Sequence, residues 1–238
     1  MSNIIIVGAG GAAGQSCLES MQDDHKLYLI SRSEIDLSKV KEKNSDNINS
    51  SIININDYNK VAEFITDITF QIDGIVFALG SITLKPFSNT SINDFKNTME
   101  DNFYNIVNFM NLAIPKMADN SSVVFFSSIA ATKGFKNHAA ISAAKSALSG
   151  FSLALAADYA PKIRFNTISP SLTYSKMSNF ITNNEKIADG LSKMHPMARL
   201  GNGSDLGSLA SFLISKKSSW ITGQNFNVDG GRSTLITK

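Results

Sequence analysis

The sequence predicts an α/β fold in which one doubly wound parallel sheet of about seven strands carries helices on both faces. Short β-branched runs without polar alternation recur along the chain, and such runs are typical of strands buried on both faces. Segments with helical spacing of apolar residues separate these runs, which is the pattern of βαβ units with right-handed crossovers. We see no repeat, low-complexity tract or linker, so residues 1–238 are expected to form a single domain.

Four strands are predicted in the amino-terminal half of the chain. Asn3–Val7 is a β-branched run that leads directly into the glycine-rich turn Gly8–Gly14, and a helix is expected over 15–22. Apolar residues spaced three or four apart predict a helix over 58–69. Further apolar runs predict strands at 26–30, 51–55 and 74–78.

Three more strands are predicted in the carboxyl-terminal half. A long amphipathic helix over 95–117 is expected to end at the turn Ala118–Asn120, and the small-residue stretch 142–159 is expected to form a second helix. The polar segment of about 173–200 contains no strand pattern, and we expect it to cover a substrate. The remaining apolar runs predict strands at 122–126, 163–168 and 224–228 and a helix at 204–214.

Composition excludes several classes of partner. The net charge is +2 and the lysines are scattered, so we predict neither a nucleic-acid nor a membrane partner. Cys17 is the only cysteine and the three histidines lie far apart in sequence, so neither a disulfide nor a metal site is expected. The apolar stretch Ile141–Ala160 carries Lys145 and Asp158, and no secretory signal is present, which predicts a cytoplasmic protein.

The glycine-rich turn predicts a dinucleotide site. Glycines let the backbone approach a pyrophosphate, whose charge is stabilised by the exposed N–H groups and the dipole at the start of a helix. A glycine cluster can also be a plain turn, but this one lies between a predicted strand and a predicted helix. The expected phosphate contacts are Gly8, Gly10, Gly11, Ala12, Ala13 and Gly14.

The end of the second predicted strand, Ile30–Ser33, contains no acidic residue. A protein that selects NAD normally has Asp or Glu here, to accept hydrogen bonds from the adenosine ribose. Ser31 and Arg32 would instead suit a 2′-phosphate, because a guanidinium can form paired charge-assisted hydrogen bonds with it. This segment favours NADP over NAD, unless Arg32 is a solvated loop residue or is neutralised by the nearby Glu34.

A family resemblance rests on two further segments. Phe125–Ala130 is an apolar strand that ends in a pair of hydroxyl residues, and His138–Lys145 begins a small-residue helix with one lysine. Together with the glycine-rich turn, these segments resemble the short-chain dehydrogenase/reductase family over essentially the whole chain. The resemblance implies a Rossmann-type fold, hydride transfer between NADP(H) and a small-molecule substrate, and a homo-oligomer, either a dimer or a tetramer.

The resemblance also assigns cofactor contacts and a catalytic set. The cofactor contacts carried over are Asn54, Ile55, Ala78, Gly80, Lys145, Pro170, Leu172 and Thr173. The catalytic residues that match the family pattern are Asn102, Ser128 and Lys145. The family usually has Tyr four residues before this lysine, where this chain has Ile141. Isoleucine cannot transfer a proton, and losing a general acid costs about 100- to 10,000-fold in rate unless another group serves.

His138 is the candidate for the missing proton donor. It precedes Lys145 by seven residues, so both lie on one stripe of a helix, and divergent members of the family resemble this spacing with Tyr at that position. An imidazole can donate a proton near neutral pH. The alternative is that His138 caps the helix or hydrogen-bonds a backbone carbonyl. Tyr104 and Tyr174 are the other phenols considered as replacements for the missing tyrosine. Lys133 and Lys136, in the loop before His138, either attract an acidic or phosphorylated substrate or are solvated.

Two functions remain open from the sequence. The first is an NADP(H)-dependent oxidoreductase, for which Ser128 suggests carbonyl or alcohol chemistry and the spacing of His138 suggests reduction of a carbon–carbon double bond. The second is a catalytically silent NADP(H)-binding protein with a role in sensing or assembly. The absence of Tyr at position 141 favours the second function, whereas Asn102, Ser128 and Lys145 favour the first.

Overall fold

The computed structural model describes residues 1–236, which form one parallel sheet of seven strands in the order β3-β2-β1-β4-β5-β6-β7. The predicted domain also includes residues 237 and 238, which lie outside the described residues. The strands are β1 (Ser2–Val7), β2 (His25–Ser31), β3 (Ile48–Ile52), β4 (Ile72–Phe77), β5 (Met117–Phe126), β6 (Ile163–Pro170) and β7 (Asn225–Val228). The predicted fold class is confirmed.

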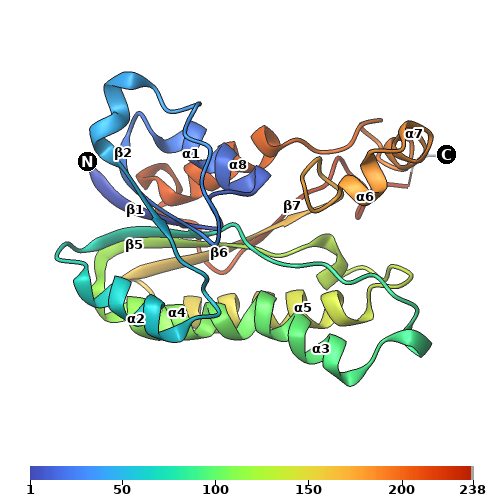
Figure 1. The fold of residues 1–238 in the computed structure, drawn as a ribbon, viewed down its shortest axis with the longest axis horizontal. Coiled ribbons are helices and arrows are strands. Elements are labelled where there is room, and N and C mark those ends of the chain that lie inside the picture. Colours follow the sequence, from blue (N-terminus) through green and yellow to red (C-terminus); the bar gives the residue numbers. More distant parts are fainter. Residues whose placement is uncertain (237–238) are drawn as a thin grey trace.

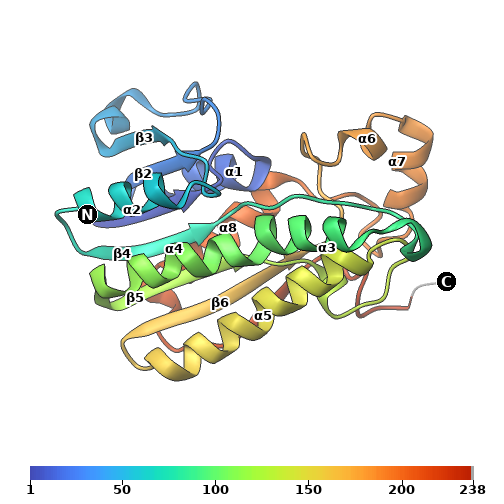
Figure 2. The same cartoon turned by 60° about the horizontal axis from the view of Figure 1, so that its bottom comes forward.

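Helices cover both faces of the sheet, as Figure 1 shows. One face carries α1 and α8, and the opposite face carries α2, α4 and α5, with α3 extending α4 (Figure 2). The short helices α6 and α7 lie beyond the ends of the strands. The helices are α1 (Ala12–Met21), α2 (Tyr58–Asp67), α3 (Ile92–Met99), α4 (Asn105–Ala113), α5 (Ala139–Tyr159), α6 (Asn179–Thr182), α7 (Glu185–Ser192) and α8 (Gly203–Ile214).

The core consists of two layers because successive side chains of a strand face opposite sides of the sheet. Ile5 of β1 packs with Phe77 and Phe125 toward α2, α4 and α5. Ile4 and Ile6, its neighbours in β1, pack toward α1 and α8. Each such fully buried side chain contributes about 1.5–3 kcal/mol of transfer free energy. The uninterrupted apolar runs of the central strands are therefore required by burial on both faces.

Helix α5 is long and apolar enough to span a bilayer by length and composition, and it is the only such helix among the described residues. It packs against β6 and the neighbouring turn after β5, and its own residues Ala144, Lys145 and Leu148 are buried in this contact. Its apolar character is therefore explained by its position over the sheet.

Several predicted boundaries are wrong. Strand β3 begins at Ile48 because its ladder with β2 pairs Leu27 with Ile48, which leaves 53–55 in the following loop. The long helix ends at Ala113, before a 3₁₀ turn that contains a proline, and residue 117 already belongs to β5. The expected turn near Asn120 is a distortion within β5, where Asn120 has a φ of 67°. Helix α5 starts three residues earlier than expected, and the cover segment contains α6 and α7.

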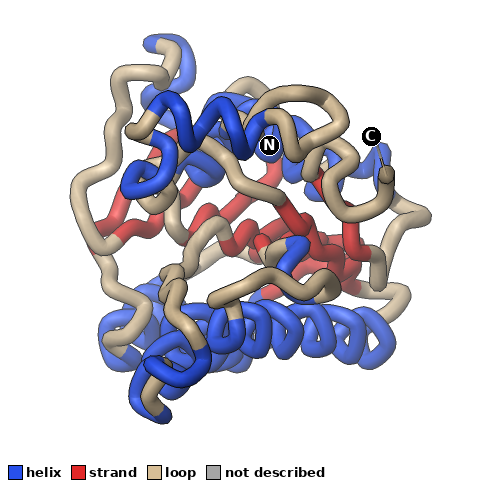
Figure 3. The backbone as a smooth tube through the Cα atoms, turned by 90° about the vertical axis from the view of Figure 1, so that its right-hand side faces the viewer, coloured by secondary structure: helices blue, strands red, loops and turns tan. Residues whose placement is uncertain are grey.

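The order of the strands reverses between β1 and β4, which creates a crevice at the carboxyl ends of the strands. Figure 3 views the molecule from that end, where the loops after the strands and the segment with α6 and α7 meet. Parallel sheets bind ligands at this position because every strand delivers its following loop to the same edge.

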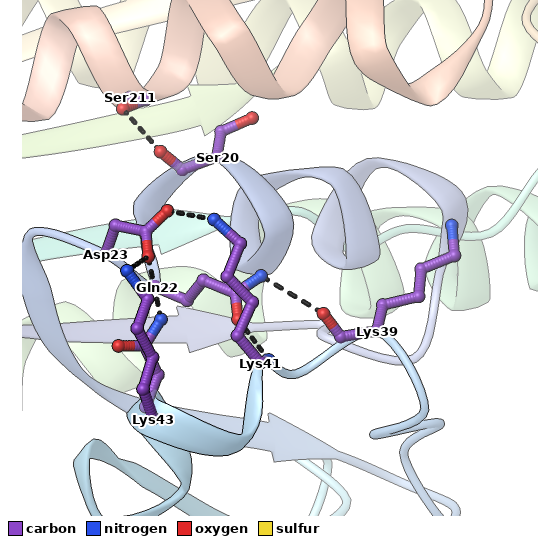
Figure 4. A network of polar contacts seen from close by, with 8 residues as sticks. Ser20, Gln22, Asp23, Lys39, Lys41, Lys43 and Ser211 are labelled. Carbon is purple, nitrogen blue, oxygen red and sulfur yellow. Dashed lines mark hydrogen bonds and ion pairs between the residues drawn. The ribbon is translucent and has the colours of Figure 1, made fainter.

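A polar network holds the connection between β2 and β3 against the end of α1 (Figure 4). The Gln22 carboxamide accepts a hydrogen bond from the Lys41 N–H at 2.8 Å and donates one to the Lys39 carbonyl at 3.2 Å. The Asp23 carboxylate binds the ammonium groups of Lys41 and Lys43. These contacts fix a connection that begins at Arg32, directly after β2.

Candidate active site

One pocket of about 910 Å³ lies at the carboxyl ends of the strands. It runs from the loop after β2, past the glycine-rich turn, to the start of α5 and the cover segment. Its lining includes the predicted residues Gly8, Gly10, Gly11, Ala12, Ala13, Ser31, Arg32, Asn54, Ile55, Ala78, Gly80, Asn102, Ser128, His138, Lys145, Pro170, Leu172 and Thr173. Gly14 is the one predicted site residue that is not part of this lining.

The glycine-rich turn joins β1 to α1. Gly8 has a φ of +89°, and a Cβ there would lie 2.5 Å from the carbonyl oxygen of Ala78. A Cβ at Gly14 would lie 2.3 Å from the carbonyl oxygen of Gly8. Gly14 therefore permits close packing of α1 on β1, and its contact with a ligand stays a prediction. The resulting cradle of backbone at the start of α1 fits a pyrophosphate.

The loop after β2 carries a cation on the pocket wall. Ser31 is buried and its hydroxyl accepts a hydrogen bond from the Ser33 N–H at 3.4 Å. Arg32 is exposed, and within residues 1–236 it forms no ion pair with Glu34 or any other carboxylate. The guanidinium is thus available to an anion at this end of the pocket.

The loop after β3 forms the adjacent rim. The carboxamide oxygen of Asn54 accepts a hydrogen bond from the Asn56 N–H at 3.2 Å, which closes a local turn. Asn56 in turn donates to the Asp101 carboxylate at 3.2 Å and accepts from Asn105 at 2.9 Å. A carbonyl oxygen has two lone pairs, so the Asn54 side chain retains one acceptor position toward the pocket.

Asn102 lies in a π-helical turn, Glu100–Tyr104, between α3 and α4, and it is fully buried. Its amide nitrogen donates to the Thr98 carbonyl at 2.9 Å and to the Ser81 carbonyl at 3.2 Å, while its oxygen accepts from the Ser81 N–H at 3.3 Å. Isolated π turns within helices are frequent at functional sites. Here the turn holds Asn102 against the segment that follows β4.

Lys145 lies beside Asn102, on the first half of α5. Only 6% of its surface is exposed, and its ammonium donates to the Phe126 carbonyl at 2.8 Å and, more weakly, to the Leu79 carbonyl at 3.4 Å. Burial lowers the pKa of Lys145 from 10.5 to about 8. A cation therefore sits at the point where β4 and β5 end, close to the change between its charged and neutral forms.

The hydroxyl pair after β5 divides into two roles. Ser127 is buried, and its hydroxyl donates to the Lys145 carbonyl at 3.0 Å, which ties the strand to α5. Ser128 lines the pocket, and its hydroxyl oxygen accepts from the Ala130 N–H at 3.1 Å. That contact leaves the O–H of Ser128 free to donate to a ligand.

His138 precedes α5 and lines the pocket. Its Nδ1 hydrogen-bonds the Lys136 carbonyl at 2.7 Å, so Nδ1 carries a proton. This is the bond to a backbone carbonyl that the sequence analysis gave as the alternative role of His138. The same bond leaves Nε2 without a proton in the neutral ring, and only the charged ring can donate from it. His138 therefore combines a structural bond with a position on the pocket wall.

No tyrosine lines the pocket within the described part of the chain. Ile141 is 4% exposed and occupies the wall one helical turn before Lys145. Tyr104 and Tyr174 are about half exposed and lie outside the lining, so neither replaces it there. Lys133, one of the two loop lysines, donates to the Ser233 carbonyl at 2.9 Å.

The cover segment is anchored at its base by polar contacts. His195 is buried, with Nδ1 donating to the Leu191 carbonyl at 2.8 Å and Nε2 accepting from the Ser171 hydroxyl at 2.8 Å. Arg199 forms a bidentate pair with Asp205 at the start of α8, with both N–O distances at 2.7 Å. A structural role for His195 agrees with this geometry, because both of its ring nitrogens are occupied.

Sequence reasoning missed several lining residues, among them Asn56, Ser81, Phe135, Lys176 and Arg232. Most of them follow a strand or precede α5, so the rule that loops after parallel strands meet at one edge could have identified them. Arg232 follows β7 by four residues, directly after two glycines.

Comparison with known proteins gives consistent matches. A protein-family model described as enoyl-(acyl carrier protein) reductase matches residues 22–233. The chain is 28% identical over 235 residues to the 3-oxoacyl-[acyl-carrier-protein] reductase FabG of Buchnera aphidicola, and the match covers 95% of either chain. It is 35% identical over 125 residues to the short-chain dehydrogenase/reductase SDRA of Arabidopsis thaliana, which covers 51% of this chain and 48% of that protein.

Among solved structures, the chain is similar to that described as ElxO with NADP bound, with a TM-score of 0.90. The two share 24% sequence identity over 98% of this chain and 99% of that chain. At 24% identity this similarity shows that the two proteins share a fold and shows nothing further.

Proposed function

The chain belongs to the short-chain dehydrogenase/reductase family, and from that premise we propose that it is an NADP(H)-dependent oxidoreductase acting on a small organic substrate. The observation that carries the proposal is the continuity of the pocket. One wall holds Arg32 and the glycine-rich turn, and the other end holds Asn102, Ser128 and Lys145. A dinucleotide that occupies the first part would extend its nicotinamide toward the second. The expected cytoplasmic location stays a prediction.

The residues present fit NADP(H). The backbone cradle at Gly8 leaves no space for a side chain and suits a pyrophosphate, and Arg32 with Ser31 suits a 2′-phosphate. When bound, the cofactor supplies or accepts the hydride. Asn54 is expected to bind the adenine, Pro170 and Leu172 with Thr173 to line the carboxamide side, and Lys145 to hold the nicotinamide ribose. The ElxO structure with NADP bound supports this choice of cofactor by its likeness in fold.

The remaining polar residues are assigned to proton and substrate positioning. The free O–H of Ser128 orients the substrate oxygen, and Asn102 keeps the loop after β4 in place beside Lys145. The Lys145 ammonium raises the positive potential where negative charge develops on the substrate. His138 delivers or removes the proton at Nε2, in place of the family tyrosine, for which this chain has Ile141.

Two reaction types fit this arrangement. Ser128 at the pocket wall favours reduction of a carbonyl or oxidation of an alcohol. The position of His138, seven residues before Lys145, favours reduction of a carbon–carbon double bond. The names of the relatives leave both open, since one is a 3-oxoacyl reductase and the family model is described as an enoyl reductase.

A catalytically silent NADP(H)-binding protein with a sensing or assembly role is the second candidate. It is favoured by the apolar Ile141 at the wall and by the bond that occupies Nδ1 of His138. The two candidates differ in one measurement. An oxidoreductase oxidises NADPH in the presence of a carbonyl or enoyl substrate panel, whereas a silent protein binds NADPH and shows no turnover with any member.

The choice of cofactor is tested with Arg32. We expect the protein to bind NADPH more tightly than NADH, and Arg32→Ala to weaken NADPH binding about 10- to 100-fold, since charge-assisted hydrogen bonds contribute about 1.5–3 kcal/mol. Fluorescence or calorimetric titration measures both affinities. Lys43→Ala is the matched control, because Lys43 lies on the same connection but pairs with Asp23 outside the pocket. Equal affinities of the wild type for the two cofactors would contradict the assignment.

The oligomeric state is the next prediction. We expect a symmetric dimer or tetramer in which α4 and α5 pair with their copies in a second subunit. Ile106, Met110 and Leu148 of these helices are buried in the core and do not contribute to this interface. The outer face of α5 retains small residues and Leu153, which is 60% exposed. Light scattering should give a multiple of 25.7 kDa, and Leu153→Asp should lower the mass. A wild-type monomer at micromolar concentration would reject the prediction.

A further inference from the structure

Arg232 is a pocket residue that the proposed chemistry leaves without a role. It lies in the turn after β7, and its guanidinium stacks over the Phe135 ring with 5.6 Å between Cζ and the ring centroid. Phe135 also packs against the imidazole of His138, with 5.4 Å between the ring centroids. A cation and the proposed proton donor are therefore both in contact with one aromatic side chain at the substrate end of the pocket.

The guanidinium of Arg232 lacks a carboxylate partner within residues 1–236. Its Nη1 is buried and has no hydrogen-bond partner there. Asp229 is the acidic residue of the same turn, but its carboxylate accepts from the N–H groups of Gly231 and Ser233, at 2.9 Å and 2.8 Å, and from the Ser233 hydroxyl. Arg232 as a whole is half-buried and the Asp229 charge acts on it, but its buried Nη1 has no acceptor, and an anionic ligand would supply one.

The charges of the other lining residues define where an anion fits. Asp101 is the one acidic residue of the described lining, and it binds Asn56 beside the loop after β3. Lys176, a further cation of the lining, lies close enough to Asp36, in the loop after β2, to attract its carboxylate. Among the described lining residues, the substrate end thus has the Arg232 guanidinium and no carboxylate, and Asp229 acts on this guanidinium from outside the lining.

We propose that Arg232 binds a carboxylate of the substrate and makes the pocket selective for short oxo, hydroxy or unsaturated carboxylic acids. The inference rests on the proposed function, because it places the reacting carbon between Arg232 and the nicotinamide end of the pocket. A planar carboxylate matches the two-pronged donor pattern of a single guanidinium. In the reductive direction, hydride from NADPH and one proton add across the C=O or C=C bond, and the carboxylate is unchanged.

The test compares acids with their uncharged analogues. Acetoacetate and acetoacetamide, and crotonate and crotonamide, are titrated into the NADP⁺-loaded protein by calorimetry, and kcat/KM is measured with NADPH. The wild type should prefer each acid at least about tenfold, and Arg232→Gln should reduce this preference to about one, because a charge-assisted bond is lost. Arg232→Lys should retain part of the preference. Lys136→Gln, an exposed cation of the preceding loop outside the lining, should leave it unchanged.

Three outcomes would overturn the inference. If the protein binds NADPH but binds each acid and its amide with equal affinity, the carboxylate site is rejected and the proposed function remains intact. Preference for dihydroxyacetone phosphate over both acids would assign the site to a phosphate instead. Absence of NADPH binding would reject the proposed function, and the inference with it.

Discussion

Replacing Lys145 with methionine is expected to lower kcat/KM about 100- to 1,000-fold, the usual effect of removing one preorganised electrostatic contact to a transition state. NADPH affinity should fall about 10- to 100-fold, since a charge-assisted hydrogen bond to the ribose contributes about 1.5–3 kcal/mol. Steady-state kinetics with the best substrate and a fluorescence titration of NADPH measure the two effects. Methionine keeps the volume of the buried stem, so the fold should persist. Unchanged kinetics and affinity would remove Lys145 from the proposed site.

The Lys145→Met substitution, which should lower activity, should raise the free energy of unfolding near neutral pH. Burial lowers the pKa of Lys145 from 10.5 to about 8, so between these values the unfolded chain binds more protons than the folded one. Lys145 therefore makes the free energy of unfolding of the wild type increase as pH rises between these two values. A shift of this size corresponds to at most about 3 kcal/mol, because the carbonyl acceptors of Phe126 and Leu79 offset part of the desolvation.

The Lys145→Met protein shares every other titrating group with the wild type, so the difference between the two isolates Lys145. Urea denaturation at several pH values should show the variant more stable than the wild type at pH 7. That advantage should shrink between about pH 8 and 10. Stability curves that stay parallel across this range would show that Lys145 titrates at its usual pKa.

The fold could be predicted because burial dictates the sequence of the central strands. Val7 and Phe125 belong to runs that are apolar on both faces, which only a parallel sheet covered by helices on both sides requires. The boundaries were less predictable because pairing decides them. Strand β3 has a largely polar sequence, and its register is set by its ladder with β2 rather than by its own residues. The Asn120 distortion within β5 likewise depends on pairing with β4 and β6.

The site was predictable to the extent that each residue follows a strand directly. Arg32, Asn54, Ala78 and Ser128 all come within two residues of a strand end, and all line the pocket. Asn102 was placed by the family resemblance, while the π turn that buries it has no evident sequence signal. At Gly14 a Cβ would meet the Gly8 carbonyl, and a glycine pattern alone does not separate such helix packing from ligand approach.

His138→Asn is the sharpest test of the proton donor. Asparagine can keep the hydrogen bond to the Lys136 carbonyl but cannot transfer a proton, so the local structure should persist while activity is lost. We expect kcat to fall about 100- to 10,000-fold, as for the loss of a general acid or base. NADPH affinity should remain within about twofold, because His138 lies near the substrate end and makes no proposed cofactor contact. Full activity of the variant on an identified substrate would exclude the role.

Ile141→Tyr in the His138→Asn background asks whether the rest of the site is preorganised for a phenol. Position 141 is buried on the pocket wall, one helical turn before Lys145, so a tyrosine hydroxyl would lie on the same stripe as the ammonium. If Ser128 and Lys145 already hold the substrate oxygen correctly, carbonyl reduction should recover by at least about tenfold, a fraction of the 100- to 10,000-fold that a positioned acid supplies. Recovery with ketones but not with enoyl substrates would assign the native chemistry of this pocket to carbonyl reduction, because Ser128 serves only the former. No recovery, in a variant that still binds NADPH, would show that Lys145 and Ser128 are arranged around the imidazole and not around a phenol.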